Sequence, residues 1–391
     1  MSLWKEYLAK KLVFDNHPAL NSELCMNRMQ TRNPCTSCMD FCPEHVFAEP
    51  CSPDAEPDWT ACIGCGLCVS ACPSRAIAPA RLYAEKFLLT ASHLLNSITH
   101  DITITCKKEA SSADIYAECP GSVPWELLSF FTLQGRVVFL VDDCETCANA
   151  SCKRMLDDSI ARVHSFWNGD DRSCYDRSCY NRSSDHCNGD HRSGEDTTGA
   201  GPEERVIVAS DPSLIPPRRY TRREAISFAM KKTGRTAAVL LPDPEKTVPD
   251  GMLFKKLLLH RIRQMRDTEG EKSPQTAFFW QLPSFTERCS ACGICTRICP
   301  VGAILRAPGP ENSGRFYMAL LPEKCTGCGL CSGICPESGI KAPAAVRVED
   351  PSRPILHAVA AVPCPRCKEP VPAGSGSALC PRCRGELGIH I

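Results

Sequence analysis

The sequence predicts an α+β protein in which two cysteine-rich modules flank a small α/β unit, and a further cysteine-rich segment ends the chain. Three observations support this prediction. Tight cysteine runs that end in proline occur both before residue 80 and after residue 283. Between them, short apolar stretches alternate with a helical pattern bounded by proline and glycine. Two C-x2-C pairs close the sequence, a spacing typical of a metal site.

The composition limits the classes of protein to consider. The 391 residues include 29 cysteines, and 43% of the residues are hydrophobic, which is enough to build cores. The 45 acidic and 45 basic residues balance, so no global field attracts nucleic acid or an anionic membrane. The sequence has neither a signal peptide nor an apolar run of the roughly 20 residues that a membrane span needs, which predicts a cytoplasmic protein. In that reducing compartment, dense cysteines indicate metal ligands rather than disulfides.

Shifts in composition divide the chain. The expected segments are an N-terminal helix (1–20), a first cysteine-rich module (21–80), an α/β unit (81–165), a disordered insert (166–202), a continuation of the α/β unit (203–282), a second cysteine-rich module (283–345) and a metal ribbon (360–391). A proline-rich linker is expected before the ribbon. The insert repeats the pentad DRSCY and has almost nothing to bury, so its cysteines are expected to bind no metal. These cysteines are Cys174, Cys179 and Cys187.

The α/β unit is predicted from apolar runs and helix boundary signals. Before the insert, strands are expected at 101–106, 115–118 and 137–141, with a helix at 124–134. After it, the unit is expected to continue with strands at 205–209, 236–241 and 277–280, a capping box at Thr221 and Glu224, and an amphipathic helix at 252–265.

Two complete C-x2-C-x2-C-x3-C-P runs lie near the C-terminus. The first is Cys289, Cys292, Cys295, Cys299 and Pro300, and the second is Cys325, Cys328, Cys331, Cys335 and Pro336. Here the chain resembles the bacterial dicluster ferredoxins, in which three thiolates of each run hold one [4Fe–4S] cluster and the fourth crosses to the other. The resemblance implies one cluster on Cys289, Cys292, Cys295 and Cys335, and a second on Cys325, Cys328, Cys331 and Cys299.

The short gaps in these runs have a geometric reason. A tight loop must wrap the cluster while its backbone N–H groups point at the sulfides, and Gly293, Gly327 and Gly329 allow that close approach. Apolar side chains next to the ligands are expected to shield the clusters and help set their potentials. These are Ile63, Leu67, Ile294 and Leu330.

The N-terminal module departs from this pattern at one position. Cys62, Cys65, Cys68 and Cys72 form a complete run, but the run before it keeps only Cys35, Cys38 and Cys42, with Arg32 in place of a first ligand. By the same resemblance, Cys42 joins Cys62, Cys65 and Cys68. The other cluster then has Cys35, Cys38 and Cys72.

Its fourth ligand has three possible solutions. Cys25 is preferred, because the layout resembles a ferredoxin variant whose first ligand lies several residues upstream. Cys51, in the connection toward the second run, is the alternative. The third solution is a three-cysteine cluster, either [3Fe–4S] or a cube with an exchangeable site.

Five more cysteines belong to the α/β unit: Cys106, Cys119, Cys144, Cys147 and Cys152. Two of them end predicted strands, where α/β folds place ligand sites. The stretch from Cys119-PGSVPWELL to Cys144-ETC resembles the delta subunit of methyl-viologen-reducing hydrogenase, an iron–sulfur protein that passes electrons toward heterodisulfide reductase. The spacing after Cys144 departs from that family. Two interpretations stay open, one additional Fe–S cluster or an interaction domain with buried thiols.

The last cysteines form two knuckles separated by twelve residues: Cys364, Cys367, Cys380 and Cys383. This is zinc-ribbon spacing, and metal binding would supply the folding energy that so short a tail lacks. Zn²⁺ is expected; mononuclear iron uses the same ligands, and no metal is the third alternative. The nearby Arg366, Lys368, Arg382 and Arg384 are accompanied by too few aromatic residues to indicate nucleic acid. A basic cluster at 218–235 is either a solvated helix face or a docking site for an acidic partner.

No dinucleotide fingerprint, P-loop, nucleophile elbow or HExxH motif is present, so no catalytic residue is assigned. The resemblances imply an iron–sulfur electron-transfer protein with four [4Fe–4S] clusters or more. It would be a subunit or partner of a multi-component anaerobic oxidoreductase, with a dehydrogenase, hydrogenase or heterodisulfide-reductase-like protein as its redox partner. A redox-sensing regulator that acts through protein or nucleic-acid contacts is the alternative. Catalysis at an open-coordination iron of the incomplete cluster is a third.

Overall fold

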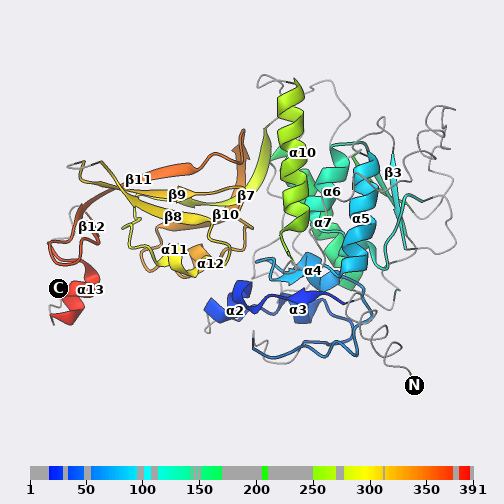
Figure 1. Cartoon of the computed structure of the whole chain (residues 1–391), viewed down its shortest axis with the longest axis horizontal. Helices are drawn as coiled ribbons and strands as arrows, with labels where there is room; N and C mark the ends of the chain where they lie inside the picture. Colours follow the sequence, from blue (N-terminus) through cyan, green and yellow to red (C-terminus); the bar gives the residue numbers. More distant parts are fainter. Residues whose placement is uncertain are drawn as a thin grey trace, which may run out of the picture. The chain divides into compact units, whose positions relative to one another are not determined.

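The computed structural model describes residues 17–29, 34–47, 54–94, 101–106, 113–141, 144, 147, 151–169, 205–209, 250–269, 277–310, 313–372 and 378–387 (Figure 1). The chain forms two compact units, one of residues 1–21 and 36–262 and the other of residues 22–35 and 263–391. Among the described residues, no helix combines the length and apolar character needed to cross a membrane.

Several sequence predictions lie outside the described residues and stay predictions. They are the N-terminal helix up to residue 16, Cys51, the three cysteines of the insert, the capping box, the strand at 236–241 and the basic cluster at 218–235. At its end the helix predicted for residues 1–20 is wrong, because Ala19–Leu20 form a β-strand.

A parallel four-stranded sheet forms the centre of the first unit, in the order β4-β3-β5-β6. Its strands are β3 (Ile102–Thr105), β4 (Ile115–Tyr116), β5 (Val137–Leu140) and β6 (Val206–Ala209). Every residue of β3 and β5 is buried, as expected for parallel strands covered on both faces. These strands are confirmed, and the pairing of β6 with β5 confirms that the sheet continues across the insert.

Helices pack beside this sheet: α5 (Arg81–Leu94), α6 (Trp125–Thr132), α7 (Ser151–Asn168) and α10 (Leu253–Glu269) (Figure 1). The prediction of α6 is confirmed, with Pro124 at its N-cap and the N–H of Gly135 bonded to the Phe131 carbonyl. Phe254 of α10 makes edge contacts with Tyr83 and Phe87 of α5. The helix predicted at 252–265 is confirmed, whereas α5 and α7 were not predicted.

The N-terminal cysteine segment of the first unit is built from short elements. β1 (Ala19–Leu20) pairs antiparallel with β2 (Ile77–Ala78), and α3 (Ser37–Asp40) contacts α4 (Leu67–Ala71). Helix α4 also contacts η2 (Pro120–Ser122) and α7, so this segment packs directly on the α/β unit.

The second unit is mainly antiparallel. β7 (Phe278–Phe285) pairs with β10 (Ile340–Val348), and a four-stranded sheet has the order β12-β11-β9-β8. Its strands are β8 (Ile304–Pro308), β9 (Arg315–Leu320), β11 (Ile355–Pro363) and β12 (Pro370–Pro372). The short helices α11 (Ile294–Ile298) and α12 (Leu330–Gly333) contact β8 and β10, respectively (Figure 1). The other helical elements are η1 (Ser22–Leu24), α2 (Met26–Met29) and α13 (Pro381–Glu386).

Two expectations about the second unit are wrong. The strand expected at 277–280 does not continue the α/β unit, because it is the start of β7 and pairs with β10. Its alternating burial, with Phe278, Trp280 and Leu282 inside, is the period of an antiparallel strand with one covered face. The expected linker is also absent, since β10 and β11 occupy most of residues 340–363. Pro343 is accommodated at a register shift between Lys341 and Ala344.

Candidate iron–sulfur and metal sites

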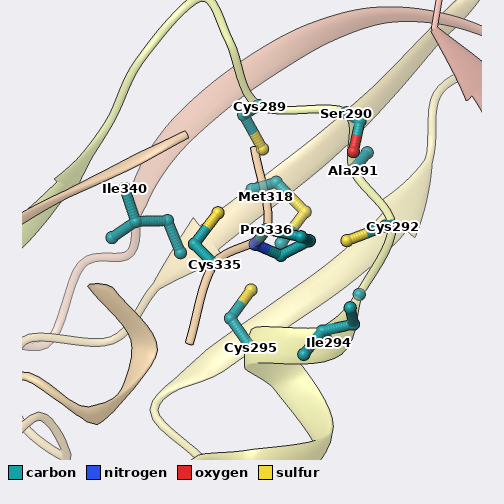
Figure 2. A pocket seen from close by; sticks show the side chains of 11 residues that line it. Cys289, Ser290, Ala291, Cys292, Ile294, Cys295, Met318, Cys335, Pro336 and Ile340 are labelled. Atoms are coloured by element: carbon teal, nitrogen blue, oxygen red, sulfur yellow. The ribbon is translucent and has the colours of Figure 1, made fainter. Parts of the chain in front are cut away.

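Four cysteines of the second unit converge on one cavity of about 310 Å³. Three of them, Cys289, Cys292 and Cys295, come from one loop, and Cys335 comes from the other run. Figure 2 shows their sulfur atoms pointing toward one another, with Met318 and Pro336 beside them. This is the set that the resemblance implies, crossing ligand included. A cavity lined by four thiols fits a cluster held by thiolates.

The backbone of this loop has a left-handed pattern that recurs in two other loops. Each C-x2-C-x2-C loop has positive φ at the residues directly before and directly after its second cysteine, with φ between 52° and 78°. These residues are Gly64 and Gly66, Ala291 and Gly293, and Gly327 and Gly329. Glycine is required where a Cβ has no room: at Gly327 it would lie 2.8 Å from the Gln281 carbonyl oxygen. Gly293, Gly327 and Gly329 thus have the left-handed conformation that favours glycine, and Ala291 takes the same conformation without being glycine. Their close approach to a cluster stays a prediction.

A second feature repeats after each run. The cysteines predicted to cross over are Cys42, Cys72, Cys299 and Cys335, and each Sγ accepts a hydrogen bond from the backbone N–H four residues later. The N···S distances are 3.4, 3.2, 3.2 and 3.2 Å, respectively. In every case the residue three positions after the cysteine has positive φ, which turns the chain back toward the sulfur. Hydrogen bonds to ligand sulfurs are one of the determinants of cluster potential.

The cysteines predicted to hold the other cluster of the second unit also lie near one another. The thiol of Cys331 lies within electrostatic range of Cys325, Cys328 and Cys299, the three cysteines with which it is predicted to share a cluster. It also interacts with Cys295 of the neighbouring set, so the two sets are adjacent.

In the first unit, Cys42, Cys62, Cys65 and Cys68 line a cavity of about 330 Å³. The thiols of Cys62 and Cys65 both interact with Cys42, the cysteine predicted to cross over from the preceding run. The expected apolar shielding is only half realised. Leu67 and Leu330 are buried, whereas Ile63 is 50% and Ile294 37% exposed. These isoleucines line their cavities from the solvent side.

The remaining N-terminal set is Cys25, Cys35, Cys38 and Cys72. Cys25 and Cys35 belong to the second unit, while Cys38 and Cys72 belong to the first. Within the second unit, the side chain of Asn27 holds Cys35 at two points. Its Nδ2 donates to the Cys35 carbonyl (2.9 Å), and its Oδ1 accepts from the Cys35 N–H (2.6 Å). Asn27 lies two residues after Cys25, so this clamp associates the segments of Cys25 and Cys35; the ligand set itself stays a prediction.

Burial controls the protonation of these thiols. It raises the pKa of Cys65 and of Cys328 to about 11, and that of Cys295 to about 12. Cluster ligands must be thiolates, so loading the sites releases protons and is favoured by rising pH.

The cysteines of the α/β unit form a connected thiol group. Cys119 and Cys152 are almost fully buried, and their thiols are hydrogen-bonded to each other. Cys152 also bonds to Cys144 and accepts from the N–H of Gly121 (3.4 Å). The hydrogen bond from Cys119 lowers the pKa of Cys152 below that of an ordinary thiol. Cys65, a predicted cluster ligand, packs against the same hydrophobic cluster.

Two further cysteines complete this group. The thiols of Cys106 and Cys147 both interact electrostatically with Cys144. The structure therefore brings all five cysteines of the α/β unit into one region, while their role as ligands stays a prediction.

The C-terminal cysteines form a more compact site. The sulfur atoms of Cys364, Cys367, Cys380 and Cys383 all lie within 4.8 Å of one another. Backbone N–H groups, with that of Cys380 first, lower the pKa of Cys364 to about 6. Four thiolates this close together fit a single metal ion, such as a tetrahedrally coordinated Zn²⁺.

Comparison with known proteins agrees with this geometry. Residues 288–339 match the family model described as a 4Fe-4S dicluster domain, and residues 55–78 match that of a 4Fe-4S binding domain. Comparison with curated proteins found no match. The chain is an iron–sulfur protein with 4Fe-4S ferredoxin-type domains and a C-terminal four-cysteine site.

Sequence reasoning missed the side chains that hold these loops in place. Asn27, Arg75, Glu126 and Arg306 all contact cluster loops or their flanking turns. Only the position of Arg75 could have been noticed in the sequence. Arg75 lies three residues after Cys72 and has positive φ, as Gly302 does three residues after Cys299. The others are brought to their sites by tertiary contacts, which no local spacing indicates.

Proposed function

We propose that this protein carries single electrons along four [4Fe–4S] clusters as a subunit or partner of a multi-component anaerobic oxidoreductase. The main support is the pair of four-cysteine cavities, each of which combines three ligands of one loop with a crossing ligand. When bound, each cluster supplies reversible one-electron chemistry. The chain supplies ligands, N–H···S hydrogen bonds and spacing, and no side chain serves as acid, base or nucleophile.

Anaerobic purification, metal analysis and an EPR-monitored potentiometric titration test this proposal. We expect about sixteen irons per chain from four clusters of four irons, plus the irons of the additional cluster proposed below for the α/β unit. We also expect several low-potential signals that re-oxidise when a partner dehydrogenase is added. An iron content near four per chain would contradict the proposal. Clusters that respond to oxygen but pass no electrons to a partner would favour the regulatory alternative.

The α/β unit holds one additional Fe–S cluster in this proposal, with ligands drawn from its five cysteines. Its support is the hydrogen-bonded trio Cys119, Cys144 and Cys152, together with the packing of Cys65 against that trio. The neighbouring clusters would then be close enough for electron exchange. Cys119→Ser should remove this signal and leave the other clusters intact. If Cys119→Ser and Cys152→Ser both keep the iron content of the wild type, the α/β unit holds no cluster, and the interpretation as an interaction domain is favoured.

The partner is proposed to be a hydrogenase-, dehydrogenase- or heterodisulfide-reductase-like protein. The support is the resemblance of residues 119–147 to a hydrogenase delta subunit. Co-purification with such a partner, followed by electron transfer to the isolated chain, tests this assignment.

The C-terminal site is proposed to hold Zn²⁺ rather than iron. Its support is the two-knuckle spacing and the close approach of the four sulfur atoms. One zinc per chain, retained when the clusters are destroyed by oxygen, is the expected result. A rubredoxin-like visible spectrum would assign iron instead.

A further inference from the structure

Arg306 is the residue from which this inference starts. It lies on β8, and its guanidinium covers the loop that carries Cys289, Cys292 and Cys295. Its Nη1 donates to the carbonyl oxygens of Ala291 (3.1 Å) and Cys292 (3.2 Å). The contact is so close that a Cβ on Gly293 would lie 2.8 Å from Nη1. A formal positive charge therefore rests directly on the backbone that wraps this cavity.

The same guanidinium also reaches the four-cysteine site. Arg306 Nη1 lies 2.7 Å from Oε2 of Glu369, two residues after Cys367. The backbone carbonyl of Glu369 accepts a hydrogen bond from the N–H of Cys364 (2.7 Å). Glu369 therefore has its position fixed by the first knuckle of the metal site. Both side chains of the ion pair are partly shielded from water.

This connection distinguishes one cluster loop from two others with the same backbone. Around the corresponding glycines of those loops, Gly66 is approached by Ser122 and Tyr83, and Gly329 by Pro343 and Ser332. Gly327 lies against Gln281. Of Gly66, Gly293, Gly327 and Gly329, only Gly293 is approached by a guanidinium.

We infer that Arg306 and Glu369 couple the four-cysteine metal site to the cluster on Cys289, Cys292, Cys295 and Cys335. Bound metal holds the first knuckle, which keeps Glu369 beside Arg306 and neutralises the guanidinium. When the knuckle loses its metal, Glu369 is released and the guanidinium charge is left uncompensated. Arg306 is a positioning residue for this cluster, and Glu369 determines whether the charge of the Arg306 guanidinium is compensated. The inference rests on the proposed function.

The sign of the effect follows from electrostatics. Reduction adds one negative charge to the cluster, so an uncompensated positive charge nearby stabilises the reduced form and raises the midpoint potential. Removing the guanidinium has the opposite sign and also leaves two loop carbonyls without their donor. The metal site thus sets the potential of one cluster among four.

The test is an EPR-monitored potentiometric titration of the full chain, with iron and zinc content measured for each variant. Glu369→Gln should raise the potential of one [4Fe–4S] signal while zinc stays bound. Arg306→Gln should lower the potential of that signal, and Arg306→Lys should restore it in part. Glu386→Gln is the matched control, because Glu386 pairs with Arg366 and Arg382 in the same ribbon but not with Arg306. It should leave all potentials unchanged.

The metal dependence is tested by Cys367→Ser combined with Cys383→Ser, which should remove the zinc. We expect the same signal to shift upward as in Glu369→Gln, and no further shift when Glu369→Gln is added to the double variant. A potential that is the same in wild type, Glu369→Gln and the zinc-free variant overturns the coupling, as does an equal shift in Glu386→Gln. A wild-type chain without [4Fe–4S] signals would instead refute the proposed function, so the two failures are distinguishable.

Discussion

The cluster loops at 62–68 and 289–295 share a backbone but differ in what surrounds them. Both have two left-handed residues before a short helix, and both runs end in an N–H···S turn. The first is fixed to an α/β unit by a buried ion pair, in which Arg75 and Glu126 are 6% and 3% exposed. The second is covered by a partly shielded arginine from a sheet. Cysteine spacing sets the backbone of each loop, whereas tertiary packing decides which charged side chains surround it.

The largest expected difference comes from removing one ligand in each loop. Cys68→Ser and Cys295→Ser should each lower the iron content by about four atoms per chain, because the oxygen of serine is a poor substitute for a thiolate. Iron analysis and EPR should show the loss of a different signal in each variant. Loss of the same signal in both would mean that the two cavities do not hold separate clusters.

The next effect tests the buried ion pair between Arg75 and Glu126, beside the first loop. Arg75 donates from Nη2 (2.5 Å) and Nε (3.0 Å) to Oε1 of Glu126, and from Nη1 to the carbonyls of Val69, Ser70 and Cys72. Removing one partner of a buried pair leaves a charge uncompensated, so Arg75→Met should cost about 3–5 kcal/mol of unfolding free energy. Anaerobic chemical denaturation measures it.

The control for this prediction removes both charges together. Arg75→Met combined with Glu126→Leu should recover part of the lost stability, because apolar replacements avoid the desolvation of both groups. If Arg75→Met alone unfolds at the wild-type denaturant concentration, the ion pair is not what fixes this loop.

A smaller effect is expected at the clamp on Cys35. Asn27→Ala removes two hydrogen bonds, each with a net value of about 1 kcal/mol, and should lower the occupancy of the cluster that uses Cys35. Cys25→Ser should remove or convert that same cluster, whereas Cys51→Ser should not. Iron content measures the occupancy of this cluster, and the EPR line shape shows whether it is converted or lost. The reverse result for Cys25 and Cys51 would exchange the predicted fourth ligand.

The smallest effect tests the one departure from glycine in the shared backbone. Ala291 has φ of +52°, while the equivalent Gly64 and Gly327 have φ of +70°. Left-handed conformations cost an alanine about 1 kcal/mol or more, so Ala291→Gly should stabilise the cluster-bound protein by about 1 kcal/mol. Denaturation with the cluster intact measures this. Gly327→Ala is the opposite control and should destabilise the protein, since its Cβ has no room.

The sequence predicted secondary structure correctly where neighbouring residues alone determine it. The strands at 102–105 and 137–140 were predicted from short apolar runs, and the helix at 125–132 from its proline and glycine boundaries. The strand beginning at Phe278 was assigned to the wrong sheet, because its partner β10 lies about sixty residues away. Helix α7 was missed because its many polar residues obscured the helical period.

The sequence by itself determined the ligand types, the loop geometry and the four-cysteine C-terminal site. These depend on spacings of two or three residues, on glycine where φ is positive and on proline after the crossing ligand. Only the tertiary structure decided which side chains hold each loop. Glu126 pairs with Arg75, and Glu369 with Arg306, across more than fifty residues of chain. Asn27 is only eight residues from Cys35, but the spacing of residues does not indicate a contact that packing creates.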